Sequence, residues 1–277
     1  MKPSIRIITK RLKGIRYIPS HLSGTIRRKW MYKVHKNDPN LKGALHPNDG
    51  MFGGNVEHYM KVGEDVIRLI EHSLQLAKKD WNELNSILDI PSGYGRELRA
   101  LLDKVPATKI TACDILQEQI DFCASSFGCK KFLSSNDFLS IRFPEKYSLI
   151  WVGSLFTHLN RKRFEDLLQL LFNALEPGGI LVFTTHGKYS IDIFESYWKK
   201  GLAPMTGRQA EIKASENDGF CFFPYRYDPS FGVSISLKSY VESLCQRILN
   251  SNAEIINYEF KGWDNHQDVF AIKNTTI

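Results

Sequence analysis

Four residues able to form a ligand site follow one short apolar run: Asp89, Pro91, Gly93 and Gly95. An apolar run that breaks into Pro and Gly and resumes at Leu98 with helical spacing predicts a strand, a tight loop and a helix. The helix start offers unpaired backbone N–H groups, and glycines let the backbone come close to a ligand. We therefore predict a nucleotide-type binding corner here.

Two common nucleotide sites are disfavoured by the same residues. A dinucleotide fingerprint needs a third glycine three positions after Gly95, where the chain has Leu98. A phosphate-cradling loop needs Gly-Lys followed by Ser or Thr, but Gly187-Lys188 is followed by Tyr189. Neither NAD binding nor nucleoside triphosphate chemistry is expected.

A second acid, Asp114, ends a β-branched run 25 positions after Asp89. A carboxylate at the end of a second strand can accept two hydrogen bonds from a ribose diol. The alternative is that Asp114 caps a helix over residues 117–124. With the glycine corner upstream, Asp114 and the adjacent Ile115 are the strongest cofactor candidates.

The elements that must position these residues are readable from the apolar pattern. Further strands are predicted over residues 131–135, 147–152 and 180–187, the first ending in Asn136-Asp137-Phe138 and the second in the small pair Gly153-Ser154. Helices are predicted over residues 55–78, from Phe164 to Leu175, and from Tyr240 to Leu249, and a pair of antiparallel strands over residues 254–260 and 267–273. The chain therefore reads as an α/β fold.

The joint pattern over roughly residues 84 to 187 resembles class I S-adenosylmethionine-dependent methyltransferases. The resemblance is carried by Asp-x-Pro-x-Gly-x-Gly-Arg from Asp89, by the Ser-x-Phe-x-His-Leu tail from Ser154, and by the Pro-Gly-Gly turn at Pro177. Two departures stand out: Pro91 replaces the usual first glycine, and Ser148 replaces an acid that often starts its strand. The resemblance implies a Rossmann-like, seven-stranded, mostly parallel sheet with one antiparallel strand and helices on both faces.

The resemblance also implies S-adenosylmethionine as cofactor and assigns roles around it. Asp137 would take the adenine amino group while Phe138 packs on the ring, although an Asx turn is an equal alternative. Tyr59, on a helix closing over the cofactor, would lie near its methionine end, although plain packing is equally expected. The predicted cofactor residues are Tyr59, Asp89, Pro91, Gly93, Gly95, Asp114, Ile115, Asn136, Asp137, Phe138, Gly153 and Ser154.

Methyl transfer to a hydroxyl also requires a base, and histidine is the side chain best suited to this at neutral pH. Three histidines fall on loops expected at or beside the carboxyl edge of the sheet: His158, His186 and His266. For each one alone, a structural role is the alternative. No His, Asp and Glu cluster has metal-ligand spacing, so no metal is expected.

The composition indicates the broad class of protein. The 277 residues, 43% of them hydrophobic, suffice for one large α/β core, and no apolar run is long enough for a membrane span, so a cytoplasmic protein is expected. The five cysteines lack paired spacing and are expected to be core residues.

The charge is concentrated at the front of the chain. Residues 1–42 hold twelve Lys or Arg against Asp38 alone, so residues 1–48 are predicted to form a basic arm ahead of a methyltransferase domain over residues 49–277. The arm could contact an anionic membrane or pack, solvated, on the main domain. Within the domain, the aromatic-rich and irregular-looking residues 188–236 are expected to cover the substrate.

Together these features predict an O-methyltransferase acting on a hydroxyl of a sugar, a glycan or another small molecule. Nucleic-acid base methylation is disfavoured, because Gly153-Ser154-Leu155-Phe156 is not an amino-methylase motif and no cysteine follows a proline. The alternative is an RNA-binding or RNA-methylating protein that uses the basic arm. The oligomeric state is not encoded in any motif.

Overall fold

The predicted strands form one seven-stranded sheet in the computed structural model, which describes residues 11–12, 15–16, 24–199, 206–225 and 228–276. The strand order is β10-β11-β7-β6-β3-β4-β5. The strands are β3 (Ile87–Asp89), β4 (Ile110–Asp114), β5 (Lys130–Leu133), β6 (Tyr147–Val152), β7 (Leu175–Thr185), β10 (Ala253–Trp263) and β11 (Gln267–Asn274). Neighbours among β3 to β7 pair in parallel, and β11 runs antiparallel to both β7 and β10. The predicted mostly parallel sheet with one antiparallel strand is confirmed.

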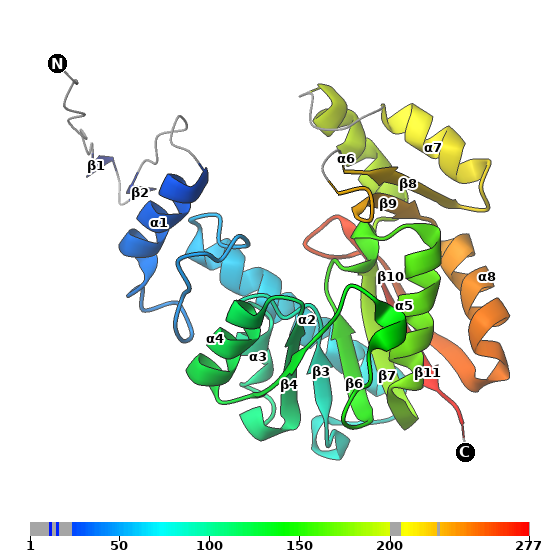
Figure 1. Cartoon of the computed structure of the whole chain (residues 1–277), viewed down its shortest axis with the longest axis horizontal. Helices are drawn as coiled ribbons and strands as arrows, with labels where there is room; N and C mark the ends of the chain where they lie inside the picture. The colour runs from blue at the N-terminus through cyan, green and yellow to red at the C-terminus, as the bar shows by residue number, and fades with distance from the viewer. Residues whose placement is uncertain (1–10, 13–14, 17–23, 200–205, 226–227, 277) are drawn as a thin grey trace.

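Helices cover both faces of the sheet, as predicted (Figure 1). One face packs against α2 (Val56–Leu76), α3 (Leu98–Leu101) and α4 (Gln117–Phe127), and the other against α5 (Arg161–Asn173) and α8 (Lys238–Leu249). Every residue of β3, β4 and β6 is buried, because two-sided cover allows a strand to be apolar throughout. Short 3-10 turns complete the connections: η1 (Trp81–Glu83), η2 (Ala107–Lys109), η3 (Phe138–Ser140), η4 (Phe156–His158) and η5 (Asn250–Asn252).

The chain order creates an open crevice at the carboxyl ends of β3 and β6. From β3 the chain passes to β4 and β5 on one side, then returns to β6 on the other side of β3. The loops after the two strands therefore diverge, and ligands of open α/β sheets bind at such a switch point.

Residues 188–236 were predicted to be irregular, and this was wrong. They contain α6 (Lys188–Lys199), α7 (Gly207–Ser215) and an antiparallel hairpin of β8 (Phe220–Pro224) and β9 (Gly232–Ser236). A small core holds them together, built from Ile191, Ala210, Ala214, Cys221, Phe223 and Ile235. The apolar residues of α6 do follow a helical period, so this helix could have been predicted from the sequence. Figure 1 shows the unit beyond the carboxyl edge of the sheet.

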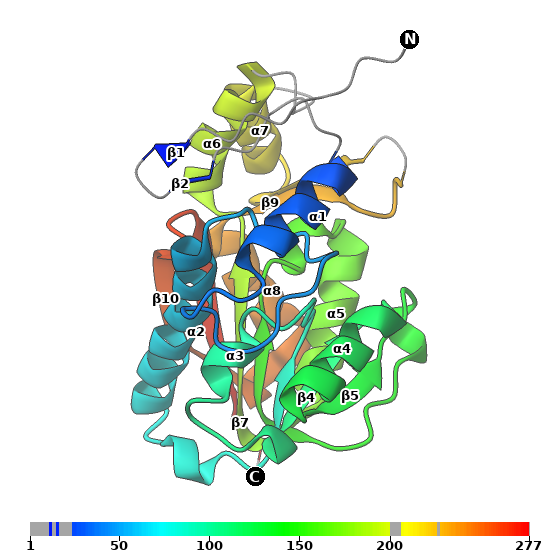
Figure 2. The ribbon, with the colours of Figure 1, turned by 90° about the vertical axis from the view of Figure 1, so that its left-hand side faces the viewer.

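In the basic N-terminal segment, α1 (Gly24–His35) packs on the main domain, because Met31 is buried in a cluster that includes Phe52 and Tyr59. The short strands β1 (Arg11–Leu12) and β2 (Ile15–Arg16) pair with each other. Figure 2 shows α1 near the same edge of the sheet as β9. The rest of the predicted arm, residues 1–10, 13–14 and 17–23, lies outside the described residues.

Two compositional expectations can be compared with the structure. All five cysteines are buried free thiols, which confirms that they serve as core residues. Within the described ranges, no helix combines the length and the apolar character needed to cross a membrane.

Candidate active site

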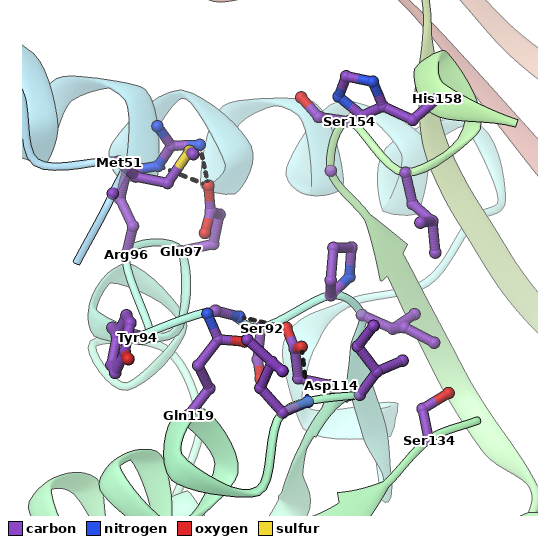
Figure 3. A pocket seen from close by; sticks show the side chains of 18 of the residues that line it. Met51, Ser92, Tyr94, Arg96, Glu97, Asp114, Gln119, Ser134, Ser154 and His158 are labelled. Carbon is purple, nitrogen blue, oxygen red and sulfur yellow. Dashed lines mark hydrogen bonds and ion pairs between the residues drawn. The ribbon is translucent and has the colours of Figure 1, made fainter. Parts of the chain in front are cut away.

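A cavity of about 520 Å³ opens at the switch point of the sheet, and Figure 3 shows it from close by. Five loops and the α1–α2 region contribute to its wall. Its lining includes nine of the residues predicted from sequence: Pro91, Gly93, Asp114, Ile115, Asn136, Phe138, Gly153, Ser154 and His158.

The glycine loop borders the cavity, but its two glycines have different roles. Gly93 (φ +51°) lines the cavity, and a Cβ on it would meet nothing within 4 Å. Gly95 (φ +76°) faces α4 instead, where a Cβ would lie 2.8 Å from the ring of Phe127 and 3.3 Å from Cys123 Sγ. Gly93 therefore leaves room for a ligand, and Gly95 lets the loop pack on the helix.

Asp89 lies beneath this loop rather than in the cavity wall. Its side chain is 1% exposed, and its Oδ2 atom has no hydrogen-bond partner within the described part of the chain. Burial, reinforced by the nearby Glu97 and Asp114 carboxylates, raises the pKa of Asp89 well above its ordinary value. The expected cofactor contact of Asp89 thus stays a prediction, with the geometry favouring a role under the loop.

The carboxylate of Asp114 lines the cavity and is oriented by two backbone N–H groups. The backbone N–H of Gly93 donates to Oδ2 at 3.0 Å and that of Leu116 to Oδ1 at 3.2 Å. Burial raises the pKa of Asp114, and these two N–H donors oppose that rise. Since each carboxylate oxygen has two acceptor positions, one on each oxygen remains for a diol.

Gln119 occupies those remaining positions. With its amide turned so that nitrogen faces Asp114, it donates to both carboxylate oxygens at 2.7 and 3.0 Å. Figure 3 shows Gln119 and Asp114 together in the wall of the cavity. A ligand diol would replace two hydrogen bonds that the protein already makes, so the site fits the ribose of the predicted cofactor.

After β5, the structure separates three residues that the sequence placed together. Asn136 and Phe138 line the cavity, together with Ser134. Asp137 does not; its Oδ1 accepts from the backbone N–H of Leu139 at 3.1 Å and caps η3. The Asx-turn alternative for Asp137 therefore describes its conformation.

Tyr59 also lies behind the cavity wall, with 1% exposure. Its hydroxyl donates to Asp49 Oδ2 at 2.6 Å, while Asp49 Oδ1 accepts from the backbone N–H of Met51. Asp49 and Met51 both line the cavity, as does Arg28 of α1. Tyr59 thus positions lining residues rather than lining the cavity itself.

An ion pair borders the same side of the cavity. Arg96 Nη2 lies 2.6 Å from Glu97 Oε1, and Arg96 also stacks on Trp263 with its Cζ 5.3 Å from the ring centroid. Burial lowers the pKa of Arg96, but Glu97 more than offsets this. Figure 3 shows the pair beside Met51.

Ser154 is held in an uncommon backbone conformation at the opposite end of the cavity. Its φ is +58°, its N–H donates to Thr184 Oγ1 at 2.8 Å, and its Oγ accepts from Gln267 Nε2 at 2.7 Å. Thr184 in turn donates to Gln267 Oε1 at 2.6 Å. Because Ser154 Oγ is the acceptor in this network, its own proton is available to the cavity.

His158 lies next to Ser154 and is the one predicted histidine that lines the cavity (Figure 3). Its Nδ1 is 2.8 Å from the carbonyl oxygen of Gly232 and 3.0 Å from the Tyr225 hydroxyl. A carbonyl can only accept, so Nδ1 carries the proton and Nε2 has the free lone pair. Burial lowers the pKa of His158 below its ordinary value, although the Gly232 carbonyl opposes this.

His186 and His266 continue away from His158 without lining the cavity. Ring centroids are 6.5 Å apart for His158 and His186, and 6.1 Å for His186 and His266. Burial and the neighbouring histidines lower the pKa of His186 to about 3, and its Nδ1 has no partner. His266 Nδ1 donates to the Asp264 carbonyl at 2.7 Å, and its Nε2 accepts from Gln267. Direct base chemistry thus points to His158 alone among the three.

Several cavity residues carried no usable signal in the sequence. Most come from segments whose position depends on tertiary packing, and they are Arg28, Asp49, Gln119, Ser134, Arg163 and Phe231. Arg96 and Glu97 could have been found, since they directly follow the glycine loop. Over the described residues, no group of three His, Cys, Asp or Glu side chains could hold a metal ion.

Comparison with known proteins gives a matching domain and several curated relatives. Residues 87–179 match the family model described as methyltransferase domain. Two curated relatives are malonyl-[acyl-carrier protein] O-methyltransferases. The Ilyobacter polytropus protein is 30% identical over 44% of this chain and 48% of its own length. The Calditerrivibrio nitroreducens protein is 26% identical over 56% and 64%. The chain thus spans between about half and two thirds of these relatives.

Solved structures agree on the fold. An S-adenosylmethionine-dependent methyltransferase from Clostridium acetobutylicum aligns with a TM-score of 0.50 and 14% identity, covering 79% of this chain and 92% of that one. The 1,6-didemethyltoxoflavin-N1-methyltransferase of Burkholderia thailandensis aligns with a TM-score of 0.50 and 10% identity, covering 79% of each chain. Residues 87–179 thus match a methyltransferase domain, and the chain has the fold of class I S-adenosylmethionine-dependent methyltransferases.

Proposed function

We propose that this chain transfers the methyl group of S-adenosylmethionine to an oxygen atom of a small-molecule acceptor, with His158 as the base. The observation that carries the proposal is that His158, in a fixed tautomer, lines the same cavity as the Asp114 carboxylate. The curated relatives, which are named O-methyltransferases, support oxygen as the acceptor atom.

The residues around Asp114 are suited to hold the cofactor. Asp114 would take the ribose diol, Ile115 and Phe138 would flank the adenine, and the open side of Gly93 would admit the methionine part. When bound, the cofactor supplies a methyl carbon activated by the adjacent sulfonium.

The protein's own contribution is positioning and proton removal. Holding an acceptor oxygen against the methyl carbon in line with its bond to sulfur accounts for most of the acceleration expected in such a displacement. His158 Nε2 takes the proton that a hydroxyl loses, because Nδ1 is committed to the Gly232 carbonyl. Ser154 can donate a hydrogen bond to the acceptor, because its oxygen already accepts from Gln267.

For the acceptor itself we propose a hydroxyl of a sugar, a glycan or a related small molecule. Phe231 provides an aromatic face in the cavity wall, and Ser154 provides a hydrogen-bonding group. A carboxylate acceptor, as the names of the curated relatives imply for those proteins, needs no base. The rate of methyl transfer should therefore depend on His158 for a hydroxyl acceptor and not for a carboxylate acceptor.

Contact with anionic membrane through residues 1–42 remains a weaker hypothesis. In the described part of that segment, Met31 is buried against the α2 region, which favours the alternative of an arm packed on the domain.

Calorimetry tests the cofactor assignment directly. The full chain is titrated with S-adenosylmethionine, with S-adenosylhomocysteine and, as control, with NADH. Micromolar binding of either adenosyl ligand, with no NADH binding, supports the proposal. A screen of sugars and lipid-linked glycans then follows, with S-adenosylhomocysteine release as readout. Absence of adenosyl-ligand binding would refute the assignment.

A further inference from the structure

We propose that Arg163 is an oxyanion-binding residue, which recognises a carboxylate or phosphate group carried by the methyl acceptor. The inference deepens the proposed function and rests on it for the identity of the ligand as acceptor. Arg163 lies near the start of α5 and lines the cavity that also contains His158.

The guanidinium of Arg163 is held between two aromatic rings. Its Cζ is 4.4 Å from the ring centroid of Phe231 and 4.8 Å from that of Phe138. Nη1 donates to the carbonyl oxygen of Ser230 at 3.3 Å, and Nη2 donates to that of Asn136 at 3.1 Å. Stacking and two hydrogen bonds fix the plane of the group, which lowers the entropy lost when a planar anion binds.

Among the described residues, Arg163 has no ion-pair partner. No carboxylate of the described residues lies within the 4.0 Å that defines an ion pair with it. Asp228 acts on it from farther away, and the Asp228 Oδ1 atom accepts from the Ser230 backbone and hydroxyl instead. Burial lowers the pKa of Arg163, which reflects a cation that has lost water without gaining a counterion.

Arg96, another arginine in the cavity wall, differs from Arg163 in its ion pairing. Arg96 also lines the cavity and stacks on an aromatic ring, but it is paired with Glu97 at 2.6 Å. Its charge is therefore already satisfied. Arg163 instead keeps three N–H donors beyond the two bonded to carbonyls, and this fork matches a carboxylate or phosphate.

Arg163 lies near His158, the proposed base, so an anion bound by Arg163 would lie at the same end of the cavity. Phe231, which stacks on Arg163, pairs with Leu159 and directly precedes Gly232, whose carbonyl fixes His158. The same hairpin residues thus hold both the proposed base and the proposed anion site. An acceptor that carries an oxyanion beside its methylated oxygen would contact both.

The test uses Arg161 as a matched control on the same helix. Arg161 also stacks on two rings, Phe220 at 5.2 Å and Tyr240 at 4.9 Å, and donates to the Asn217 carbonyl, but it is absent from the cavity lining. The Nε–H resonances of both arginines are assigned in the ¹⁵N-labelled full chain with the variants R161K and R163K. Phosphate, malonate and the neutral malonamide are then titrated at constant ionic strength.

The expected result is a saturable shift of the Arg163 resonance with phosphate or malonate, at least about tenfold tighter than with malonamide, and none at Arg161. The tighter of the two anions identifies the chemical source of the group. Equal responses at both arginines, or no preference for anions over malonamide at Arg163, would overturn the proposal. Calorimetry with S-adenosylhomocysteine on the same sample tests the proposed function separately, so either can fail alone.

Discussion

At the scale of single residues, the structure divides the predicted cofactor set into wall and support. Asp114, Phe138 and Ser154 form part of the cavity wall, whereas Asp89 and Tyr59 lie behind it. Asp89 was predicted from its place at a strand end, and Tyr59 from the family resemblance. Neither argument separates wall from support, since the direction of a side chain depends on the packing around it.

Replacing Asp114 with Ala should weaken S-adenosylhomocysteine binding by about 2 kcal/mol or more while leaving the fold intact. The variant loses the acceptor of two charge-assisted hydrogen bonds to the ribose. Calorimetry measures the affinity, and far-ultraviolet circular dichroism checks the fold. Asp137→Ala serves as control, because Asp137 caps η3 outside the cavity wall. Unchanged affinity in folded Asp114→Ala would remove Asp114 from the site.

His158 should impose an acid limb on the rate of methyl transfer. The base works only when neutral, and burial lowers the pKa of His158 below its ordinary value of 6.5. Activity should therefore persist through pH 6.5 and fall only at more acid pH. His158→Asn should lower kcat by about 10² or more and abolish this limb, whereas His266→Asn should keep it. A carboxylate acceptor would leave the His158→Asn rate nearly unchanged.

At the scale of elements, the sequence predicted those helices and strands whose apolar residues follow a single period. The strand β6 is a short apolar run and α2 has a clear amphipathic pattern, so both were predicted close to their true limits. The helix after the glycine loop was shorter than its apolar pattern indicates, because α3 covers only Leu98–Leu101.

The inserted residues 188–236 and the α1 region show what sequence periodicity misses. Phe231 and Arg28 reach the cavity only because the hairpin and α1 dock on the carboxyl edge of the sheet. Their own segments contain no binding motif. Such residues become visible only when distant segments are packed together.

The contact between α2 and the glycine loop yields a prediction at this scale. A Cβ on Gly63 of α2 would lie 2.7 Å from the backbone oxygen of Arg96. Although Ala is preferred over Gly in a helix by about 1 kcal/mol, Gly63→Ala should lower the free energy of unfolding by about 1–3 kcal/mol and weaken S-adenosylhomocysteine binding.

Chemical denaturation and calorimetry measure the two effects of Gly63→Ala. The control is Gly53→Ala, since a Cβ there would meet nothing within 4 Å. Equal stability of Gly63→Ala and the natural chain would show that α2 can shift without affecting the loop.

At the scale of the whole molecule, buried histidine couples stability to pH. The folded state holds His186 neutral, with its pKa lowered to about 3, whereas the unfolded chain binds a proton near the ordinary value of 6.5. Stability should be unaffected above pH 6.5 and should fall as the pH drops from 6.5 toward 3, because the unfolded state then binds more protons.

The size of this effect can be isolated with His186→Asn. Relative to the variant, the natural chain should lose up to about 1.4 kcal/mol per pH unit between pH 6.5 and 3. Urea unfolding at pH 7.5, 6 and 5 gives the comparison, with the exposed His58 replaced by Asn as control. Parallel pH dependences for the natural chain and His186→Asn would contradict the assigned protonation.

The way the insertion meets the cavity bears on how enzymes of this kind diversify. Among its described residues, only Phe231 lines the cavity, while the groups suited to the cofactor come from the loops after β3, β4 and β5. On the proposed assignments the insertion adds one acceptor contact, whereas Ser154, His158 and Arg163 come from the β6–α5 region. Mutation or recombination within codons 188–236 should therefore alter the wall beside Phe231 and leave the loops proposed to hold the methyl donor unchanged.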